Sequence, residues 1–195
     1  MSDFSLEKYA SSLSRKPLSL GIVDRAYEPT RLLTENERKN VVKLKFKDAK
    51  YEFLGNIFTR REELWSALGV DGDTAAYKRL LEAIEKPGKA QETMFKLRKA
   101  DAKLSDLPFA MYYPNDAGMY LTSGVIFAKL GNISNASFHR MLLLSDSRAA
   151  LRIVPRNLYT MLKEKNKGGE DLEVALVVGM HPVAQLAAAM SPSYG

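Results

Sequence analysis

One stretch of seven residues concentrates side chains that could do chemistry. It combines an amide, two hydroxyls, an imidazole and a guanidinium, in the order Ser134-Asn135-Ala136-Ser137-Phe138-His139-Arg140. If the stretch is a β-strand, alternation places Asn135, Ser137 and His139 together on one face. Arg140 then lies on the opposite face, and a bulge would be needed to bring it to the same site as Asn135. An ordinary strand with one solvated polar face has the same pattern, so both interpretations stay open.

Two further places combine residue types that suit a ligand. Pro155-Arg156-Asn157 marks a predicted helix start, where free N–H groups and the positive end of the helix dipole favour an anion. An ordinary first turn looks the same. Gly179-Met180-His181-Pro182 follows an apolar run and precedes Ala187-Ala188-Ala189. Such small side chains let a flat molecule approach the backbone, and they equally let a helix pack closely on a sheet.

Other catalytic chemistries are excluded by what the sequence lacks. There is no cysteine, so disulfides, thiolate metal sites and cysteine nucleophiles are ruled out, and there are only two histidines. Between Asp116 and Glu164 the only carboxylate is Asp146, in a predicted turn. No nucleophile elbow or phosphate-binding loop is present. A self-contained acid–base or metal enzyme is therefore hard to build from these residues.

The positive charge does not indicate a nucleic-acid partner. The formal net charge is +6, but residues 1–100 hold 20 basic and 15 acidic residues, whereas residues 101–195 hold 9 and 8. The densest basic run, Lys43 to Lys50, alternates with apolar residues, which is typical of one solvated strand face. No apolar run approaches the ~20 residues of a membrane helix, and no secretion signal opens the chain. We therefore expect a cytoplasmic protein with no nucleic acid and no membrane span.

The elements that position these residues divide the chain into two predicted domains of an α+β fold. Residues 1–104 are expected to form a mixed α/β domain, and residues 105–195 a second domain of β-meander or barrel type. In the first domain the periodicity predicts helices over 4–13, 59–68 and 73–85 and strands over 18–23, 41–46 and 51–54. A charged turn is expected at 34–37, and a Thr-x-x-Glu capping box at Thr59.

In the second domain, turn residues separate a series of strand-like runs. Strands are predicted over 109–113, 120–129, 135–144, 149–154 and 172–178. Helices are predicted over 155–165 and 183–190, and residues 89–107 as a helix and a connection. Spacing of this kind suggests a β-meander or barrel.

Several blocks together resemble the UbiD family of decarboxylases, in the family's order and spacing. In the second half they are Tyr120-Leu121-Thr122-Ser123-Gly124-Val125-Ile126, Asn135-Ala136-Ser137-Phe138-His139-Arg140-Met141, Ile153-Val154-Pro155-Arg156 and Val177-Val178-Gly179-Met180-His181-Pro182. In the first half they are Gly55-Asn56-Ile57-Phe58, Arg60-Arg61-Glu62 and Leu68-Gly69-Val70-Asp71. The resemblance covers residues 5–195, and it is to an N-terminal portion of enzymes such as 3-polyprenyl-4-hydroxybenzoate decarboxylase.

The resemblance implies a cofactor and a reaction. The cofactor is prenylated FMN with a divalent metal, Mn²⁺ or Mg²⁺, and a monovalent cation, K⁺ or Na⁺. The reaction interconverts an unsaturated or aromatic carboxylic acid with its decarboxylated product and CO₂. The resemblance also implies a flavin-binding split β-barrel that follows an N-terminal α/β domain.

The same resemblance implies roles for individual residues. Asn135 matches the amide that ligates the metal bridging to the cofactor phosphate, and an amide oxygen suits a hard cation. Arg140 matches the arginine beside the substrate carboxylate, which a guanidinium can grip with two hydrogen bonds. The positions that match cofactor contacts are Ser123, Ser137, Phe138, His139, Arg156, Ala188, Ala189 and Met190.

Two departures from the family pattern limit what the chain is expected to do. Asn157 stands where the family has a metal-binding histidine, and asparagine has less affinity for a transition metal. In the family pattern the catalytic and metal-binding glutamates lie beyond Gly195. We therefore expect an N-terminal part or subunit that is inactive alone and that works with a C-terminal half or a separately encoded subunit.

One alternative function stays open at this point. The chain could instead be a non-enzymatic flavin- or phosphate-binding or assembly module of the same family.

An incomplete barrel also exposes strand edges and apolar surface, so a homo-oligomer is expected. A buried Arg140 without acidic partners would cost roughly 3–5 kcal/mol, so it is either hydrated or covered by another chain.

Overall fold

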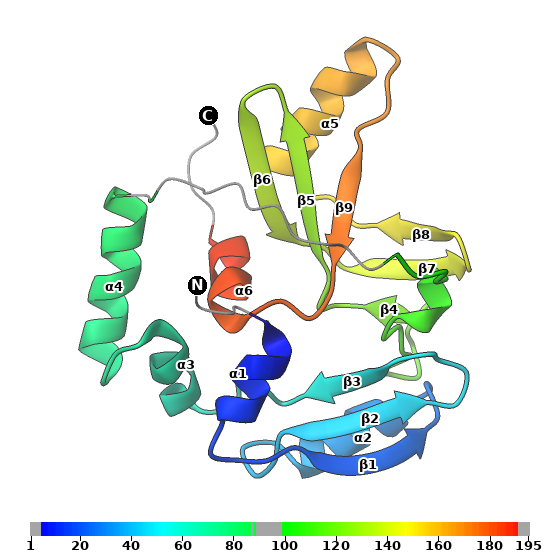
Figure 1. Ribbon diagram of the computed structural model, residues 1–195. Helices are drawn as coiled ribbons and strands as arrows, with labels where there is room; N and C mark the ends of the chain where they lie inside the picture. The colour runs from blue at the N-terminus through cyan, green and yellow to red at the C-terminus, as the bar shows by residue number, and fades with distance from the viewer. Residues whose placement is uncertain (1–4, 87, 89–98, 191–195) are drawn as a thin grey trace.

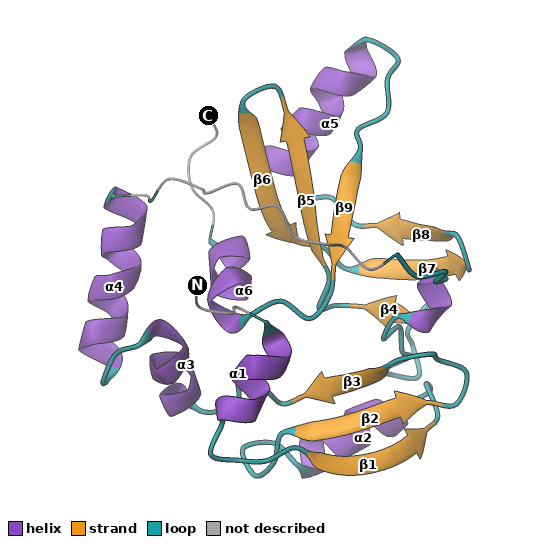
Figure 2. Ribbon diagram, in the orientation of Figure 1, coloured by secondary structure: helices purple, strands orange, loops and turns teal. Residues whose placement is uncertain are grey.

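The computed structural model describes residues 5–86, 88 and 99–190. In that part the strands form three sheets of three strands each, and no sheet closes into a barrel. The predicted α+β class is therefore confirmed. Figure 2 shows the sheet of the first half at the bottom of the view and the two sheets of the second half above it. Within these residues no helix is long and apolar enough to cross a membrane.

The first half contains one element that the sequence does not predict. Its elements in chain order are α1 (Leu6–Ser12), β1 (Leu18–Val23), α2 (Glu28–Glu35), β2 (Val42–Phe46), β3 (Glu52–Gly55), α3 (Arg61–Leu68) and α4 (Asp73–Glu85). All correspond to predicted elements except α2, whose last residues were expected only as a charged turn. A proline in its first turn suits a helix start.

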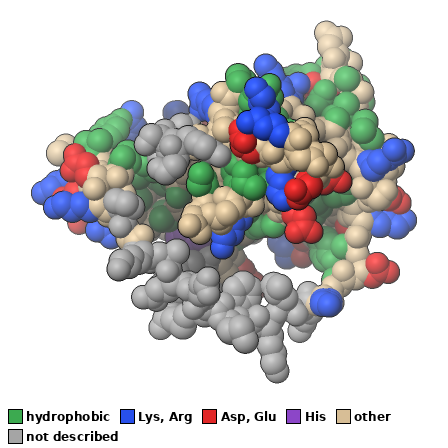
Figure 3. Space-filling view, turned by 90° about the horizontal axis from the view of Figure 1, so that it is seen from above, with side chains coloured by type: hydrophobic (Ala, Val, Ile, Leu, Met, Phe, Trp, Pro, Cys, Tyr) green, Lys and Arg blue, Asp and Glu red, His purple; other side chains and the backbone are tan. Residues whose placement is uncertain are grey.

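The lysine run lies on a solvated strand face, as predicted. On β2 the side chains of Val42, Leu44 and Phe46 are buried, and Lys43 and Lys45 between them are half-exposed. Strand β2 is central, parallel to β1 and antiparallel to β3. The Lys43 ammonium lies 2.7 Å from a Glu52 carboxylate oxygen on β3. Basic and acidic side chains are interspersed on the face seen from above in Figure 3.

The start of α3 corrects the predicted capping box by one residue. Glu63, rather than Glu62, accepts hydrogen bonds from the backbone N–H groups of Thr59 and Arg60, at 3.1 and 3.2 Å. The first residue before the helix is thus Arg60. The predicted cap at Ser5 of α1 is confirmed, since its hydroxyl accepts from the Lys8 N–H.

The second half contains two sheets and two α-helices. Its elements are η1 (Leu104–Asp106), β4 (Tyr120–Leu121), β5 (Val125–Leu130), β6 (Ile133–Phe138), β7 (Met141–Ser145), β8 (Arg148–Leu151), α5 (Asn157–Lys167), β9 (Val174–Val177) and α6 (Pro182–Ala189). The strand predicted over 109–113 is present only as isolated bridges. Helix α5 begins at Asn157 and not at Pro155. Residues 89–98 of the predicted helix and connection lie outside the described residues.

Two predicted long strands each break at the same level, and the prediction of continuous strands is wrong there. The run 120–129 divides into β4 and β5, and the run 135–144 divides into β6 and β7. The last pair of one sheet is Val125 with Phe138, and the first pair of the other is Leu121 with Met141. The two breaks therefore form one corner, at which the chain passes from the β6-β5-β9 sheet to the β4-β7-β8 sheet.

Gly124 lies at this corner in close contact with the ends of neighbouring side chains. A Cβ on Gly124 would lie 2.5 Å from the Met141 Cε and 2.7 Å from a Leu176 methyl group. The Gly124 carbonyl also accepts the N–H of His139, across the corner. The two sheets and α5 enclose a core whose buried members are Phe109, Leu121, Ile126, Ala128, Met141, Leu158 and Met161.

A buried arginine joins the sheet of the first half to the segment that enters the second half. The Arg25 side chain is 4% exposed and lies over the Phe46 ring. Its guanidinium donates to the carbonyls of Ser105, Leu107 and Phe109 and to the Asp48 carboxylate. The residues that follow this segment pair with both halves of the chain. Met111 pairs with Ala26 of the first half, and Ala110 pairs with Tyr120 of the second half. The domain boundary near residue 105 stays a prediction.

We expect Arg25→Met to lower the free energy of unfolding by at least about 2 kcal/mol, because it leaves three carbonyl oxygens without their charged donor. Urea denaturation measures the change. Arg31→Met is the matched control, since Arg31 is exposed on α2 and pairs with Glu35. It should change stability by no more than about 0.5 kcal/mol. Equal effects of the two substitutions would contradict the role given to Arg25.

Candidate functional site

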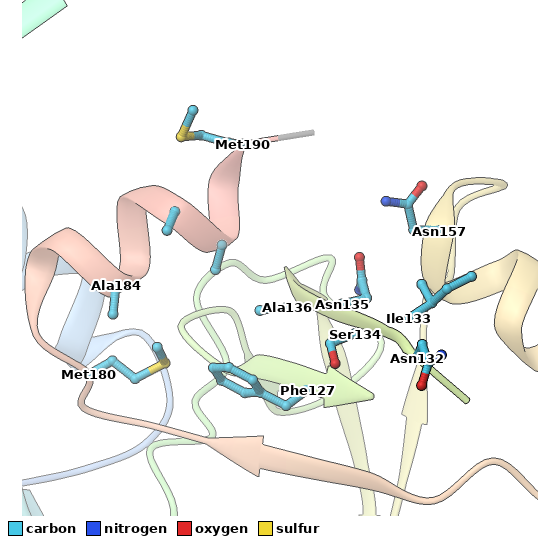
Figure 4. A pocket seen from close by; sticks show the side chains of 12 residues that line it. Phe127, Asn132, Ile133, Ser134, Asn135, Ala136, Asn157, Met180, Ala184 and Met190 are labelled. Carbon is cyan, nitrogen blue, oxygen red and sulfur yellow. The ribbon is translucent and has the colours of Figure 1, made fainter. Parts of the chain in front are cut away.

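A pocket of about 420 Å³ lies between α6 and the edge strand β6 (Figure 4). One wall comes from the sheet, through Phe127 and Ala136, and the other from α6, through Ala184, Ala187 and Ala188. The remaining lining residues are Asn132, Ile133, Ser134, Asn135, Asn157, Met180 and Met190. Two walls of small and apolar side chains suit the faces of a flat ring system.

Two amide side chains lie at one end of this pocket. Asn135 comes from β6, and Asn157 is the first residue of α5. In Figure 4 both lie on the side of β6 that faces away from α6, and the Asn135 oxygen points toward the open side. The structure thus brings together the two residues predicted as metal ligands. It also places the predicted cofactor residues Ala188 and Met190 at the same pocket.

Three polar residues of β6 and the corner are linked by hydrogen bonds. The Asn135 amide donates from Nδ2 to the Ser137 hydroxyl at 2.8 Å. The Ser137 oxygen lies 2.8 Å from Nε2 of His139, whose Nδ1 lies 3.2 Å from the Arg152 carbonyl oxygen. His139 is buried, at 6% exposed. The prediction that Asn135, Ser137 and His139 share one face is therefore confirmed.

Arg140 lies on the other side of the corner and does not line the pocket. Its guanidinium carbon lies 4.5 Å from the centre of the Tyr120 ring, and the residue is exposed. No strand bulge brings it beside Asn135, because the chain leaves β6 at Phe138 and enters β7 at Met141. Arg140 is thus not buried within this chain, which leaves open whether it is hydrated or covered by another chain.

The other predicted cofactor residues lie around the pocket or the corner. Ser123 is exposed in the segment between β4 and β5. Phe138 is half-buried at the end of β6. Arg156 is exposed immediately before α5, and Ala189 is exposed at the end of α6. None of these four lines the pocket, so their roles stay predictions.

Four pocket residues were not singled out from the sequence, namely Phe127, Asn132, Ile133 and Ala184. Phe127 is exposed between buried Ile126 and Ala128 on β5, whereas Ala184 comes from α6. An aromatic residue at an exposed strand position was the available signal for Phe127. A second hollow of about 640 Å³ shares Phe127 and Asn135 and adds Glu173. Glu173 carries the only carboxylate among the residues that line either hollow.

The donors at the pocket fit a hard divalent cation in part. Amide oxygens are ligands that Mg²⁺ and Mn²⁺ accept. Among the described residues, however, no group of three histidine, aspartate or glutamate side chains could hold a metal. Asp146, the only carboxylate between Asp116 and Glu164, does not line the pocket and instead contacts Lys103 and Ser105. Hydrogen bonds from Lys103 and Ser105 hold its pKa below the usual range. A cation bound by the neutral amides of Asn135 and Asn157 thus needs additional ligands that carry negative charge, such as a phosphate.

Helix α6 is held in place by a cluster of aromatic residues at its start. His181 caps the helix by accepting the Val183 N–H at Nδ1, and its ring packs edge-on against Tyr9 of α1 at 5.3 Å. The Tyr9 hydroxyl donates to the Glu63 carbonyl of α3. Burial raises the pKa of Tyr9 to about 12 and lowers the pKa of His181. Glu63 also forms an ion pair with Arg15.

Comparison with known proteins places the chain in a family. The model of the 3-octaprenyl-4-hydroxybenzoate carboxy-lyase Rift-related domain of UbiD proteins matches residues 82–195. The chain is 35% identical to an anhydromevalonate phosphate decarboxylase of Aeropyrum pernix over 197 residues, which is 100% of this chain and 45% of that protein. An enzyme of the same name from Methanothermobacter thermautotrophicus is 35% identical over 173 residues, covering 87% and 41%. The chain belongs to the UbiD family.

The solved structures agree on the fold. The UbiD-class enzyme HmfF from Pelotomaculum thermopropionicum, in an evolved dimeric form with prFMN, superposes with a TM-score of 0.84. Its identity is 22%, and the match covers 99% of this chain and 48% of that one. The vanillic acid decarboxylase of Sedimentibacter hydroxybenzoicus gives a TM-score of 0.77 at 14% identity, covering 97% and 46%. The chain thus spans less than half the length of these relatives.

We expect the stability of the protein to fall as the pH drops below the ordinary His181 pKa of 6.5. Burial lowers the folded-state pKa, so the unfolded chain binds more protons in that range, and stability must rise with pH. His181→Asn keeps a cap acceptor and cannot titrate. Urea unfolding at pH 7 and pH 5.5 should show a smaller loss for the variant. An unchanged loss would show that His181 does not carry this dependence.

Proposed function

We propose that the chain is the cofactor-binding part of a UbiD-class decarboxylase that uses prenylated FMN. The observation that carries the proposal is the pocket, which joins a wall of small side chains on α6 to two amides at one end. The small-residue wall suits the flavin ring, and the amide end suits a cation held with the cofactor phosphate. The prFMN in the HmfF structure supports the same assignment.

The residues of the pocket and the corner would bind the metal, the cofactor and the substrate. Asn135 and Asn157 offer oxygens to Mn²⁺ or Mg²⁺, while the remaining sequence-predicted contacts surround the flavin. When bound, the cofactor would supply an electron sink for cleavage of the carbon–carbon bond that joins the carboxylate to the rest of the substrate. Arg140, exposed and stacked on Tyr120, can grip a carboxylate with two hydrogen bonds. A monovalent cation remains part of the proposal through family membership alone.

The substrate proposed is a phosphorylated, unsaturated carboxylic acid. Relatives that are 35% identical act, by their names, as anhydromevalonate phosphate decarboxylases. Proton transfer would need carboxylates that the described pocket does not provide, apart from Glu173 at its margin. The proposed partner is therefore a C-terminal portion, either on the same polypeptide or on a separate subunit. We also propose that the assembled enzyme is a homo-oligomer.

A non-enzymatic module is the second candidate function. It is favoured by Asn157 in place of the family histidine and by the absence of an acidic cluster among the described residues. Such a module would bind flavin or phosphate at the same pocket without turnover.

Mixing experiments distinguish the two functions. We expect no decarboxylation of anhydromevalonate phosphate by the 195-residue chain with prFMN and Mn²⁺. CO₂ release should appear when the C-terminal portion of the Aeropyrum pernix relative is added. Arg140→Met should abolish that release, because methionine cannot bind a carboxylate, whereas the exposed Arg148→Met on β8 should not. Flavin binding without any turnover in the mixture would favour the non-enzymatic module, and turnover by the chain alone would overturn the expected need for a partner.

The metal ligand Asn157 generates a second prediction. We expect Asn157→His to bind Mn²⁺ about tenfold or more tightly, because an imidazole is a better ligand than an amide for a transition metal. Electron paramagnetic resonance of free Mn²⁺, titrated with the chain and FMN, measures the affinity. Asn166→His, near the other end of α5, is the matched control and should leave the affinity unchanged. Equal affinities for the wild-type chain and Asn157→His would contradict the ligand role.

A further inference from the structure

The direction of the hydrogen bonds from Arg152 to Asn135 is determined by the groups at the two ends. A backbone carbonyl can only accept, so the Nδ1 that lies 3.2 Å from the Arg152 oxygen must carry a proton. In the neutral imidazole Nε2 is then an acceptor. The Ser137 hydroxyl, 2.8 Å from Nε2, therefore donates its only proton to His139.

This assignment decides which way the Asn135 amide points. Having given its proton to His139, the Ser137 oxygen can only accept, and Asn135 must present its Nδ2 to it at 2.8 Å. The reversed amide would set its oxygen against the lone pairs of Ser137. Oxygen and nitrogen of an amide are assigned from such networks. Here the network leaves one orientation, with the Asn135 oxygen away from Ser137 and toward the open side of the pocket, as drawn in Figure 4.

The fixed end of the network lies outside the pocket. His139 is buried at the corner, and its backbone N–H is held by the Gly124 carbonyl. The Arg152 carbonyl follows β8, and the Arg152 N–H is in turn bonded to the Arg140 carbonyl. The imidazole is thus held by the Arg152 carbonyl, and the backbone of His139 by the Gly124 carbonyl. A ligand in the pocket cannot reorient the amide without breaking bonds in the core.

We infer that Ser137 and His139 are positioning residues that turn the oxygen of Asn135, and not its nitrogen, toward the cation end of the pocket. This extends their predicted role as flavin contacts. The orientation itself stands on the hydrogen bonds, whereas its use by a cation rests on the proposed function. A cation that met the NH₂ group instead would lose a ligand, so the network preorganises the site before metal arrives.

Nuclear magnetic resonance of the full chain tests the orientation without metal. We expect His139 to have its proton on Nδ1, and the Asn135 side-chain NH₂ to exchange more slowly than that of an exposed asparagine. Ser137→Ala should abolish the slow exchange, and Ser137→Thr, which keeps the hydroxyl, should restore it. Ser145→Ala, a strand serine outside the pocket, should have no effect on the Asn135 signal. A proton on Nε2 of His139, or an unchanged Asn135 signal in Ser137→Ala, would overturn the inference.

A Mn²⁺ titration in the presence of FMN separates this inference from the proposed function. We expect paramagnetic broadening at Asn135 in the wild type, and a dissociation constant about tenfold or more higher for Ser137→Ala. Ser137→Thr should bind as the wild type does. Equal binding by the wild type and Ser137→Ala would overturn the positioning of a metal ligand. Absence of broadening in the wild type, with the expected amide signals, would refute the proposed cation site and leave the fixed orientation standing.

Discussion

Much of the molecule depends on the hydrogen bonds that the buried Arg25 guanidinium donates. It donates to three carbonyl oxygens of the segment that leads into the second half. The same segment continues to Ala110, whose backbone pairs with Tyr120. The ring of Tyr120 in turn supports Arg140. The sheet of the first half therefore contributes to the site, although none of its residues lines the pocket.

The corner between the two sheets of the second half has a separate effect. At this corner the consecutive residues His139 and Arg140 point in different directions, as alternation along the chain also predicts. The imidazole enters the core and joins the hydrogen bonds that reach Asn135, and the guanidinium remains at the surface. The proposed metal end and the proposed carboxylate grip are thus built from one short stretch. Gly124 lies at the same corner, and its carbonyl accepts the His139 N–H.

Local patterns predict the sequence of elements well, and they fail where tertiary packing decides. The lysine-rich strand and the turn at Gly131 are readable because alternation and turn chemistry act within a few residues. The breaks at the corner fall at Thr122-Ser123-Gly124 and at His139-Arg140, and they are missed because strand-like apolar residues resume directly after each of them. The shared face of Asn135 and His139 follows from alternation. The direction of their hydrogen bonds does not, because it depends on the Arg152 carbonyl, a group that side-chain patterns do not report.

The short connections of the second half also bear on how the protein folds. Strands β5 and β6 are joined through a two-residue turn at Gly131-Asn132, and β7 and β8 through Asp146-Ser147. The atoms that orient the Asn135 amide consequently come from within residues 135–152 of the chain. Closing loops of that size costs little entropy, whereas the β5–β9 pairing joins residues about 50 apart. The oriented amide can thus form from local hairpins early in folding, before β9 and α6 complete the walls around it.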